Sequence, residues 1–318
     1  MSTVVLASLN TAVERLLIAP NFRVGEVNDL DEDHLLPGGK GVNTARILAG
    51  LRALGDGVPA LNGHLCGFLG GASGELVAAG LAESGIDGTW QRTMARTRFS
   101  EILVDPDDPA RATVFNGRGE QVSIEELTAL DERYVGRIAE AVGVVCSGST
   151  PPGVRPDVYA QWIRHAHDAG KWSLLDARGP VFTAAIEAVP SIVKINRDEL
   201  TAITTDTTTQ INDWLELGVT TVIITDGSQP LHAITPSGTA EVVPPTVQTR
   251  SGVGSGDAFT AGLVAALEES AWQGWDAALR LASACGAANA MNLRAGLPSG
   301  FAASDLRKLA DRTTVTWR

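Results

Sequence analysis

The stretch SIVKINRDELTAITTDTTTQINDWLELGVTTVIITDG, residues 191–227, decides the fold class. It begins and ends with short apolar, β-branched runs at 191–196 and 220–227, and two helix-like segments lie between them. Strands that alternate with helices are typical of parallel strands joined by crossover helices. Because both runs are nearly all apolar, each strand is expected to be buried on both faces. The stretch therefore predicts an α/β protein whose parallel sheet is covered by helices on both sides.

The same alternation extends over most of the chain. Further strands are expected at 3–8, 142–148 and 172–177. Helices are expected at 41–54, 73–85, 124–140, 155–169, 197–203, 207–217, 256–270 and 274–292. No internal repeat, low-complexity tract or linker rich in proline and serine divides the chain, so a single domain is predicted over residues 1–318.

Two segments depart from the strand–helix alternation. Residues 10–36 and 90–118 contain strand-like pieces, such as RLLIA, FRVGEV, TRFSEILV and ATVFN, that alternate polar and apolar residues without helices between them. They predict one small antiparallel sheet beside the main sheet. Such a sheet is expected to cover a cleft as a lid, or to form the contact of a homodimer.

The composition argues against two classes of partner. The chain has 318 residues, of which 44% are hydrophobic, and a formal net charge of −12. A chain this acidic, whose lysines and arginines are scattered, is a poor partner for nucleic acid or for an anionic membrane surface. No apolar run approaches the length of a membrane helix, and the N-terminal MSTVVLASLN reads as a strand and not as a signal peptide.

The three cysteines point to a reducing compartment. Cys66, Cys146 and Cys285 are odd in number, lie far apart and form no CxxC or Cys/His pattern that would bind zinc. They are expected to be buried, reduced thiols in a cytoplasmic protein.

The glycine-rich turn RSGVGSGDAF, residues 250–259, carries the main chemical signal. The apolar spacing of 256–270 predicts a buried helix, so the turn lies at a helix N-terminus, where free N–H groups and the helix dipole bind anions. Asp257 at this place is either only a helix-capping acid or the general base of a phosphoryl transfer. In the second interpretation Asp257 takes the proton of an acceptor hydroxyl, while the N–H groups of Gly254, Ser255 and Gly256 stabilise the transferring phosphoryl group.

Other phosphate-binding motifs do not fit. The turn is G-x-G-x-G, not the G-x-G-x-x-G of dinucleotide-binding proteins, and no second βαβ unit with an acidic residue follows it. GGKG at 38–41 lacks the spacing and the hydroxyl of a P-loop. The protein-kinase motifs are absent from the sequence.

Two signatures in order identify a family resemblance. PGGKGVNTARILAGLRALG (37–55) and SGVGSGDAFTAG (251–262) resemble the two signatures of the ribokinase/PfkB family of carbohydrate kinases. Between them, CSGSTPPGV (146–154) and KINRDEL (194–200) are similar to the family's S-G-S-x-P-x-G and K-P-N-x-x-E-L segments. LNTAVE, VGEVN and TRFSEI resemble the sugar-phosphate branch, which contains 1-phosphofructokinase and tagatose-6-phosphate kinase.

The resemblance implies a ribokinase-like three-layer α/β/α fold with a mostly parallel central sheet and a small β-sheet lid, and ATP and Mg²⁺ as cofactors. It implies that Asp257 is the base and that residues 254–256 form the anion hole. Substrate contacts are implied for Asn10, Glu14, Gly38, Gly39, Lys40, Asn43 and Arg98, with Lys40 and Arg98 directed at a substrate phosphate. Nucleotide-side positions are implied for Lys194, Asn196, Thr225, Gly227 and Asn292, and magnesium organisation, largely through water, for Asn196 and Glu199.

Several positions depart from the family pattern. Glu14 stands where the family has Asp, and its extra methylene moves the carboxylate outward, so the sugar is expected to be smaller, shifted or different there. Asp29 stands where this branch often has Arg, in an acidic stretch that would repel a sugar phosphate. Arg118 stands where the branch prefers proline and is a candidate for the missing cation. LDARG at 175–179 replaces L-D-T-S-G.

The sequence therefore predicts an ATP- and magnesium-dependent kinase of a sugar phosphate, of the fructose 1-phosphate or tagatose 6-phosphate type. One alternative is a kinase of an unphosphorylated sugar or a nucleoside, which Glu14 and the acidic residues 29–33 favour. A second alternative is a sugar-binding regulatory protein without catalytic activity. Which sugar and which hydroxyl react, and the oligomeric state, are left open by the residues.

Overall fold

The computed structural model describes residues 1–108 and 112–318, and its centre is a ten-stranded sheet. The strand order is β14-β13-β12-β11-β10-β9-β8-β1-β4-β5. These strands are β1 (Thr3–Ser8), β4 (Asn62–Gly70), β5 (Gly88–Thr93), β8 (Gly143–Ser147), β9 (Trp172–Asp176), β10 (Ile192–Asn196), β11 (Thr221–Thr225), β12 (Leu231–Thr235), β13 (Gly238–Val243) and β14 (Thr314–Trp317). Neighbours from β5 to β11 pair in parallel, and β12, β13 and β14 continue the sheet as antiparallel strands.

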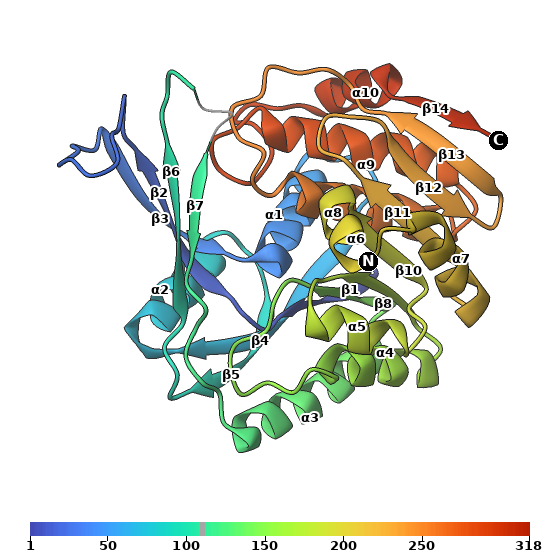
Figure 1. The fold of residues 1–318 in the computed structure, drawn as a ribbon, viewed down its shortest axis with the longest axis horizontal. Coiled ribbons are helices and arrows are strands. Elements are labelled where there is room, and N and C mark those ends of the chain that lie inside the picture. Colours follow the sequence, from blue (N-terminus) through green and yellow to red (C-terminus); the bar gives the residue numbers. More distant parts are fainter. Residues whose placement is uncertain (109–111) are drawn as a thin grey trace.

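Helices cover both faces of this sheet (Figure 1). One face carries α1 (Lys40–Ala53), α2 (Gly71–Glu83), α8 (Ser255–Glu269), α9 (Trp275–Ala290) and α10 (Ala303–Arg312). The other carries α3 (Ile124–Glu140), α4 (Val158–Asp168), α5 (Pro180–Ile186), α6 (Arg197–Ile203) and α7 (Thr207–Leu217). The predicted three-layer α/β/α class with a mostly parallel sheet is confirmed.

The alternation of side chains along β1 explains why two cores form. Val4 and Leu6 belong to the apolar cluster on the side of α1 and α8, whereas Val5 and Ala7 belong to the cluster on the side of α3 and α4. Successive side chains of a strand point to opposite faces, so a wholly apolar strand requires cover on both sides. The apolar runs of the sequence thus determine the layering directly.

Local sequence also sets where the helices begin. Ser123 accepts a hydrogen bond from the Glu126 N–H at 3.2 Å, and the Glu126 carboxylate accepts one from the Ser123 N–H at 2.8 Å. This capping box satisfies two donors at the start of α3, a feature worth about 1 kcal/mol. The buried face of α3 then packs Tyr134 against Trp162 of α4, with ring centroids 4.0 Å apart.

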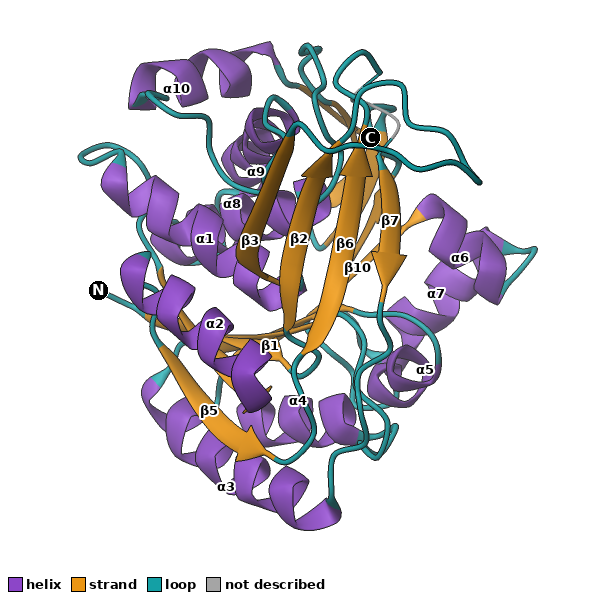
Figure 2. Ribbon diagram, turned by 90° about the vertical axis from the view of Figure 1, so that its left-hand side faces the viewer, coloured by secondary structure: helices purple, strands orange, loops and turns teal. Residues whose placement is uncertain are grey.

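A second, four-stranded sheet stands beside the first in the order β3-β2-β6-β7 (Figure 2). Its strands are β2 (Ala12–Ile18), β3 (Glu32–Gly38), β6 (Arg98–Val104) and β7 (Thr113–Asn116). Strands β2 and β6 pair in parallel, and the two outer pairs are antiparallel. Its small apolar cluster, which includes Leu16 and Ile102, packs against Val253 of the glycine turn.

The structure corrects the predicted boundaries of this sheet in two places. Residues 90–93 were expected in the small sheet, but they belong to β5, which pairs with β4 at the edge of the large sheet. FRVGEV, at 22–27, forms no strand and lies in the connection between β2 and β3. Both segments alternate polar and apolar residues, and that pattern shows a half-buried strand without showing which sheet it joins.

The strand ends bring chemistry-bearing residues to one edge. Asn10 follows β1, Ser147 ends β8, Asp176 ends β9 and Asn196 ends β10. Because these strands are parallel, their carboxyl ends meet at the same side of the sheet, where α/β proteins bind their ligands. In residues 1–108 and 112–318, no helix combines the length and the apolar character needed to cross a membrane.

Candidate active site

Two cavities lie at this edge and meet at Asp257. The first, of about 640 Å³, lies between the small sheet and the strand ends, and we call it the acceptor cavity. The second, of about 770 Å³, lies between β10, β11 and the start of α8, and we call it the donor cavity. Both are within the size range of small-molecule sites. Four residues line both cavities: Lys40, Glu199, Gly254 and Asp257.

Asp257 lies in the first turn of α8 and is only 6% exposed. Its Oδ2 accepts a hydrogen bond of 2.9 Å from Asn43 Nδ2, which the sequence had placed among the substrate contacts. Burial raises the pKa of Asp257 to about 6, although the positive charge of Lys40 and the Asn43 hydrogen bond act in the opposite direction. A carboxyl group with a pKa near 6 is ionised at neutral pH and is basic enough to take up a proton.

The glycine turn before α8 leaves some of its amides free for an anion. Gly254 has φ of 80°, and a Cβ there would lie 2.8 Å from Ala295 Cβ, so only glycine fits this turn. The Ser255 N–H donates to Gly252 O at 3.2 Å, whereas no protein acceptor is found among the described residues for the N–H groups of Gly256 and Asp257. Of the three amides predicted for the anion hole, that of Ser255 is therefore already engaged.

A residue outside the prediction, Asn289 of α9, fixes this turn. Its Nδ2 donates to Val253 O at 2.9 Å and to Ser255 Oγ at 3.1 Å. Its Oδ1 accepts from the Gly296 N–H at 2.9 Å. Asn292, which the resemblance had placed in the nucleotide pocket, lines neither cavity, and its amide donates to Gly296 O at 2.9 Å. The side chain of Asn289, one helical turn earlier, supports the turn from behind.

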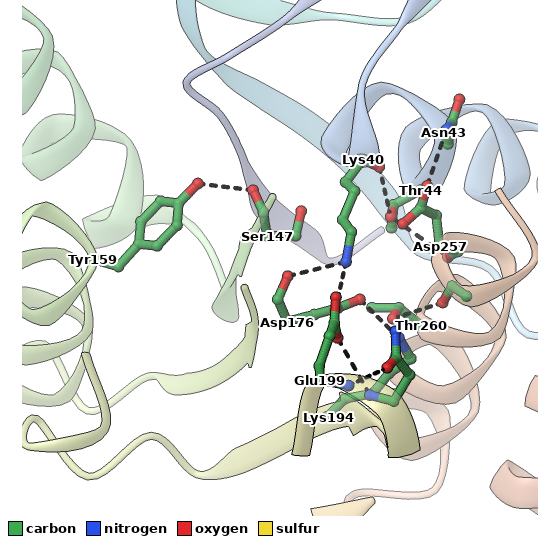
Figure 3. Close-up of polar contacts among 12 residues, drawn as sticks. Lys40, Asn43, Thr44, Ser147, Tyr159, Asp176, Lys194, Glu199, Asp257 and Thr260 are labelled. Carbon is green, nitrogen blue, oxygen red and sulfur yellow. Dashed lines mark hydrogen bonds and ion pairs between the residues drawn. The ribbon is translucent and has the colours of Figure 1, made fainter. Parts of the chain in front are cut away.

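Lys40, Asp176 and Lys194 form a buried bridge between the cavities, and Figure 3 shows them beside Asp257 and Glu199. Lys40 Nζ lies 2.7 Å from Asp176 Oδ1, and Lys194 Nζ lies 2.7 Å from Asp176 Oδ2. Burial disfavours the ionised carboxyl, but the two ammonium groups together outweigh it and hold the pKa of Asp176 well below its usual range. Burial alone would lower the pKa of Lys40, but the charges of Asp176 and Asp257 raise it, so the amine stays protonated.

This bridge changes the expected place of Lys40. The sequence directed Lys40 at a phosphate on the far end of the acceptor, but its ammonium group lies where the two cavities meet. No role was predicted for Asp176 from the sequence. Its partner Lys40 is 136 residues away in sequence, so the ion pair follows only from the fold.

The acceptor cavity is lined by most of the predicted substrate residues. Asn10, Glu14, Gly39, Lys40, Asn43 and Arg98 all contribute to it. Gly38 does not, because it lies opposite Ala12 in the β2–β3 pair, where a Cβ would approach Glu14 Cβ to 2.6 Å. Gly38 thus allows two strands to lie close together, and Gly39, with φ of 110°, is the glycine at the cavity.

Glu14 and Ser147 bring unsatisfied polar groups to this cavity. Glu14 is 5% exposed, and burial raises the pKa of its carboxyl group above the usual value, while the charge of Arg46 opposes this. Among the described residues, no side chain or backbone group forms a hydrogen bond or ion pair with the Glu14 carboxylate. The buried hydroxyl of Ser147 likewise has no hydrogen-bond partner in the described part of the chain. Buried polar groups are normally paired, so these two fit a ligand that carries hydroxyl groups.

Three arginines line the acceptor cavity. Arg98, Arg118 and Arg178 line it, and none of them forms an ion pair within the part of the chain that the structure describes. Arg98 donates to backbone and amide oxygens, including Asn10 O at 2.9 Å. Burial lowers the pKa of Arg98, the charge of Glu14 opposes this, and the charge of Arg178 lowers the pKa further, so the two cations are close enough to repel each other. An anion is the group that such a cluster binds.

The donor cavity contains the other predicted residues. Lys194, Asn196, Thr225 and Gly227 line it together with Glu199 and the turn 254–256. The side chain of Lys194 faces Gly256, since a Cβ built on that glycine would lie 3.3 Å from Lys194 Nζ. The buried hydroxyl of Ser283, also in this cavity, has no partner among the described residues.

Asn196 and Glu199 satisfy each other at the start of α6. Asn196 Oδ1 accepts from the Glu199 N–H at 2.7 Å, and Glu199 Oε2 accepts from the Asn196 N–H at 3.3 Å. The described residues contain no group of three or more His, Cys, Asp or Glu side chains that would enclose a metal ion. Mg²⁺ commonly uses one or two carboxylates together with water and phosphate oxygens. Glu199 lines both cavities, and its carboxylate fits a magnesium site of this kind, in which water and phosphate oxygens are the other ligands.

Known proteins are similar to this chain in sequence and in fold. The model of the pfkB family carbohydrate kinases matches residues 4–299. A 1-phosphofructokinase of Rhodobacter capsulatus is 31% identical over 265 residues, which cover 81% of both chains. That of Escherichia coli K12 is 29% identical over 268 residues, again covering 81% of both chains.

Solved structures agree on the fold. Phosphofructokinase-2 of Escherichia coli, in complex with potassium, superimposes with a TM-score of 0.84 at 24% identity, covering 98% of this chain and 99% of that one. A ribokinase of Thermotoga maritima has a TM-score of 0.75 at 17% identity, covering 98% of this chain and all of that one. With the match to the family model over nearly its whole length, this chain belongs to the pfkB family of carbohydrate kinases.

Proposed function

We propose that this kinase transfers the terminal phosphoryl group of ATP to a hydroxyl of a sugar phosphate of the fructose 1-phosphate or tagatose 6-phosphate type. The observation that carries the proposal is the meeting of two cavities at one buried carboxyl group whose pKa is raised to about 6. The 1-phosphofructokinases similar to this chain support the choice of acceptor.

Asp257 acts as the general base in this proposal. Its side chain lies at the junction of the cavities, so an acceptor hydroxyl in the first cavity can donate its proton to the carboxylate as the oxygen attacks. The Asn43 hydrogen bond holds Oδ2 in place and leaves the other oxygen of the carboxylate for the substrate. Positioning of this kind removes much of the entropic barrier to the transfer.

The start of α8 and the two lysines stabilise the negative charge of the migrating group. The N–H groups of Gly256 and Asp257 have no protein acceptor among the described residues and lie at the positive end of the helix dipole. Lys40 and Lys194 are held by Asp176 on either side of the transfer path. Because these donors are fixed before substrate binds, they need no reorganisation during the reaction.

ATP and Mg²⁺ fit the donor cavity. Its volume of about 770 Å³ is adequate for a nucleotide, and Ser283 supplies an unused buried hydroxyl. When bound, the metal would neutralise charge on the phosphates of ATP. Glu199 would hold it through water, and Asn196 would keep the Glu199 backbone in position.

The arginines of the acceptor cavity would bind the phosphate already present on the sugar. Arg98, Arg118 and Arg178 supply three guanidinium groups without a carboxylate partner among the described residues. Arg118 and Arg178 stand where the family has other residues, and they would replace the arginine that Asp29 displaces. None of residues 29–33 lines the cavity, so the acidic stretch gives little support to a neutral acceptor.

The small sheet would act as the lid of this cavity. Glu14, Arg98, Ser100 and Ile102 of its strands form one wall, so movement of the sheet would open or close the site. Closure would exclude water, which competes with the sugar for the phosphoryl group.

The outer surface of the small sheet supports a homodimer. It exposes Leu35, Phe99 and Phe115, which are 51%, 46% and 56% accessible. Exposed apolar residues gathered on one sheet favour contact with a second copy. Sedimentation at several concentrations tests this: a dimer is expected, and a monomer at every concentration would contradict it.

An ADP-release assay tests the function directly. The full chain is incubated with ATP and Mg²⁺, and with fructose 1-phosphate, tagatose 6-phosphate, free fructose or free ribose. We expect higher kcat/KM with a sugar phosphate and loss of turnover when the metal is chelated. Preference for free ribose would favour the neutral-sugar alternative, and sugar binding by calorimetry without ADP release from any sugar would favour the regulatory alternative.

A further inference from the structure

Arg46 of α1 is a partly buried cation that the catalytic scheme does not use. Its NH1 donates to Asn43 Oδ1 at 3.0 Å and to Ala295 O at 3.3 Å, and its NH2 donates to Pro37 O at 2.6 Å. No carboxylate lies within ion-pair distance of it in the part of the chain that the structure describes. Burial lowers the pKa of Arg46, and the nearby charges of Glu14 and Asp257 raise it.

The hydrogen bonds form a chain from Arg46 to the catalytic carboxylate. Arg46 NH1 donates to Asn43 Oδ1, and Asn43 Nδ2 donates to Asp257 Oδ2. A guanidinium group can only donate, so the oxygen of the Asn43 amide must face Arg46 and its NH2 group must face Asp257. Without the arginine, the amide could rotate and place its oxygen against the carboxylate, where both groups would repel.

Arg46 also connects three separate segments around the site. Pro37 O belongs to β3 of the small sheet, Asn43 lies on the same helix as Arg46, and Ala295 O lies after α9 near the glycine turn. A Cβ on Gly254 of that turn would contact Ala295, so the position of Ala295 bears on the turn as well. One side chain therefore ties the small sheet to the carboxylate and to its anion-binding amides.

The charge of Arg46 acts on two of the carboxylates that line the acceptor cavity, Glu14 first and Asp257 second. Glu14, on β2, and Asp257, on α8, are the two carboxylates whose charges act on Arg46. The other charged groups around Asp257 are Lys40 of α1, Asp176 of β9 and Lys194 of β10, and the two lysines are already bound to Asp176. Arg46 is thus the cation next to Asn43 that no carboxylate neutralises by direct contact.

We propose that Arg46 is a positioning residue for phosphoryl transfer, which orients the Asn43 amide toward Asp257 and keeps that carboxylate ionised when the small sheet is in place. This inference rests on the proposed role of Asp257 as the base. It assigns no contact between Arg46 and the substrate, because Arg46 does not line the acceptor cavity.

The variants Arg46→Gln and Arg46→Lys test the proposal through the pH profile of kcat/KM. Arg46→Gln removes the charge, so we expect the acidic limb of the profile to move to higher pH and kcat to fall between about tenfold and about a hundredfold. Arg46→Lys keeps the charge but cannot reach three oxygens at once. It should return the limb toward its original position while kcat stays below that of the unaltered chain.

Matched controls separate positioning from stability. Arg52→Gln, on the same helix, removes a bond to Asn62 far from the cavities and should leave the profile unchanged. Binding of ATP by calorimetry and thermal melting show that each variant is folded. If a folded Arg46→Gln keeps the original pH profile, or if Arg46→Lys moves the limb as far as Arg46→Gln does, the proposal is overturned. Failure of the proposed function itself would appear separately, as turnover that survives Asp257→Asn.

Discussion

The two cavities are built on opposite principles. In the donor cavity, Lys194 is bound to Asp176, and Asn196 and Glu199 cap the same helix turn, so these three side chains already have partners within the chain. In the acceptor cavity, Glu14 has no described hydrogen-bond or ion-pair partner, and Arg118 and Arg178 form no described ion pair. Groups with internal partners are held in place in advance, whereas groups without them gain their partners from a ligand.

This contrast separates chemistry from specificity. On the donor side, the turn 251–257 and the K-x-N-x-x-E run at 194–199 keep the family's residue types, whereas TDGSQP at 225–230 stands for a more usual S-L-G-x-x-G. Of the departures, Glu14, Arg118 and Arg178 line the acceptor cavity, whereas Asp29 lines neither cavity. We therefore expect the donor side of Asp257 to supply the common phosphoryl-transfer chemistry and the acceptor side to determine the choice of sugar.

The substitution Asp257→Asn is the strongest test of the proposed division between the two cavities. Without the base at the junction, we expect kcat to fall by about a thousandfold or more, while ATP binding stays close to that of the unaltered chain. ADP release and calorimetry measure the two effects. Asp305→Asn is the matched control, since Asp305 also lies in the first turn of a helix, α10, away from both cavities. Substantial turnover in Asp257→Asn would show that another group accepts the proton.

Asp176→Asn tests the internal pairing of the donor side. The change leaves Lys40 and Lys194 without their shared counter-charge in a buried position, so we expect a loss of about 3 kcal/mol in the free energy of unfolding. Urea denaturation measures it. Asp276→Asn, which removes a more exposed pair with Arg280, should lose at most about 1 kcal/mol. Equal losses in the two variants would mean that the bridge is no more important than a surface ion pair.

The fold could be predicted because its main signals are local. Apolar runs such as 143–147 and 221–225 indicate strands buried on both faces, and the glycine turn predicts the start of α8. The membership of β5 in the large sheet could not be predicted, because alternation alone does not choose between two partners. Strands β12, β13 and β14 were missed as well, since they are only four to six residues long and such short strands carry a weak pattern.

In the site, too, the features that local motifs carry could be predicted, and the contacts between distant segments could not. Asp257, Glu199 and Gly39 lie where the motifs placed them, at the cavities. The partner of Lys40 is a residue 136 positions away. Asn292, expected in the nucleotide pocket, lines neither cavity, and Asn289, for which no role was predicted, supports the anion turn. Contacts of this kind depend on how distant strands and helices meet. A motif gives a residue's type and neighbourhood but not the direction in which its side chain points.

Arg178→Met tests the open, acceptor side. We expect the KM for the sugar phosphate to rise by between about tenfold and about a hundredfold, because a hydrogen bond to a charged phosphate is lost, while kcat changes little. The KM for ATP should not change. Arg307→Met removes an exposed arginine of α10 and serves as the control. An unchanged KM for the sugar phosphate would place its phosphate elsewhere and would favour an unphosphorylated acceptor.

The smallest expected effect is the pH dependence of the unaltered chain. Burial raises the pKa of Asp257 to about 6, so the carboxylate is ionised at pH 7 and becomes protonated as the pH falls through about 6. A protonated carboxyl group cannot accept the hydroxyl proton, so kcat/KM should fall to about half near pH 6 and then decrease about tenfold per pH unit. Asp176 stays ionised over this range because its pKa lies well below the usual value. The lysine bridge should therefore persist, and nucleotide binding measured at pH 5.5 and at pH 7.5 should agree. If the limb instead appears near pH 4, the group that controls turnover is an exposed carboxylate, and the buried junction of the two cavities is not where the proton is taken up.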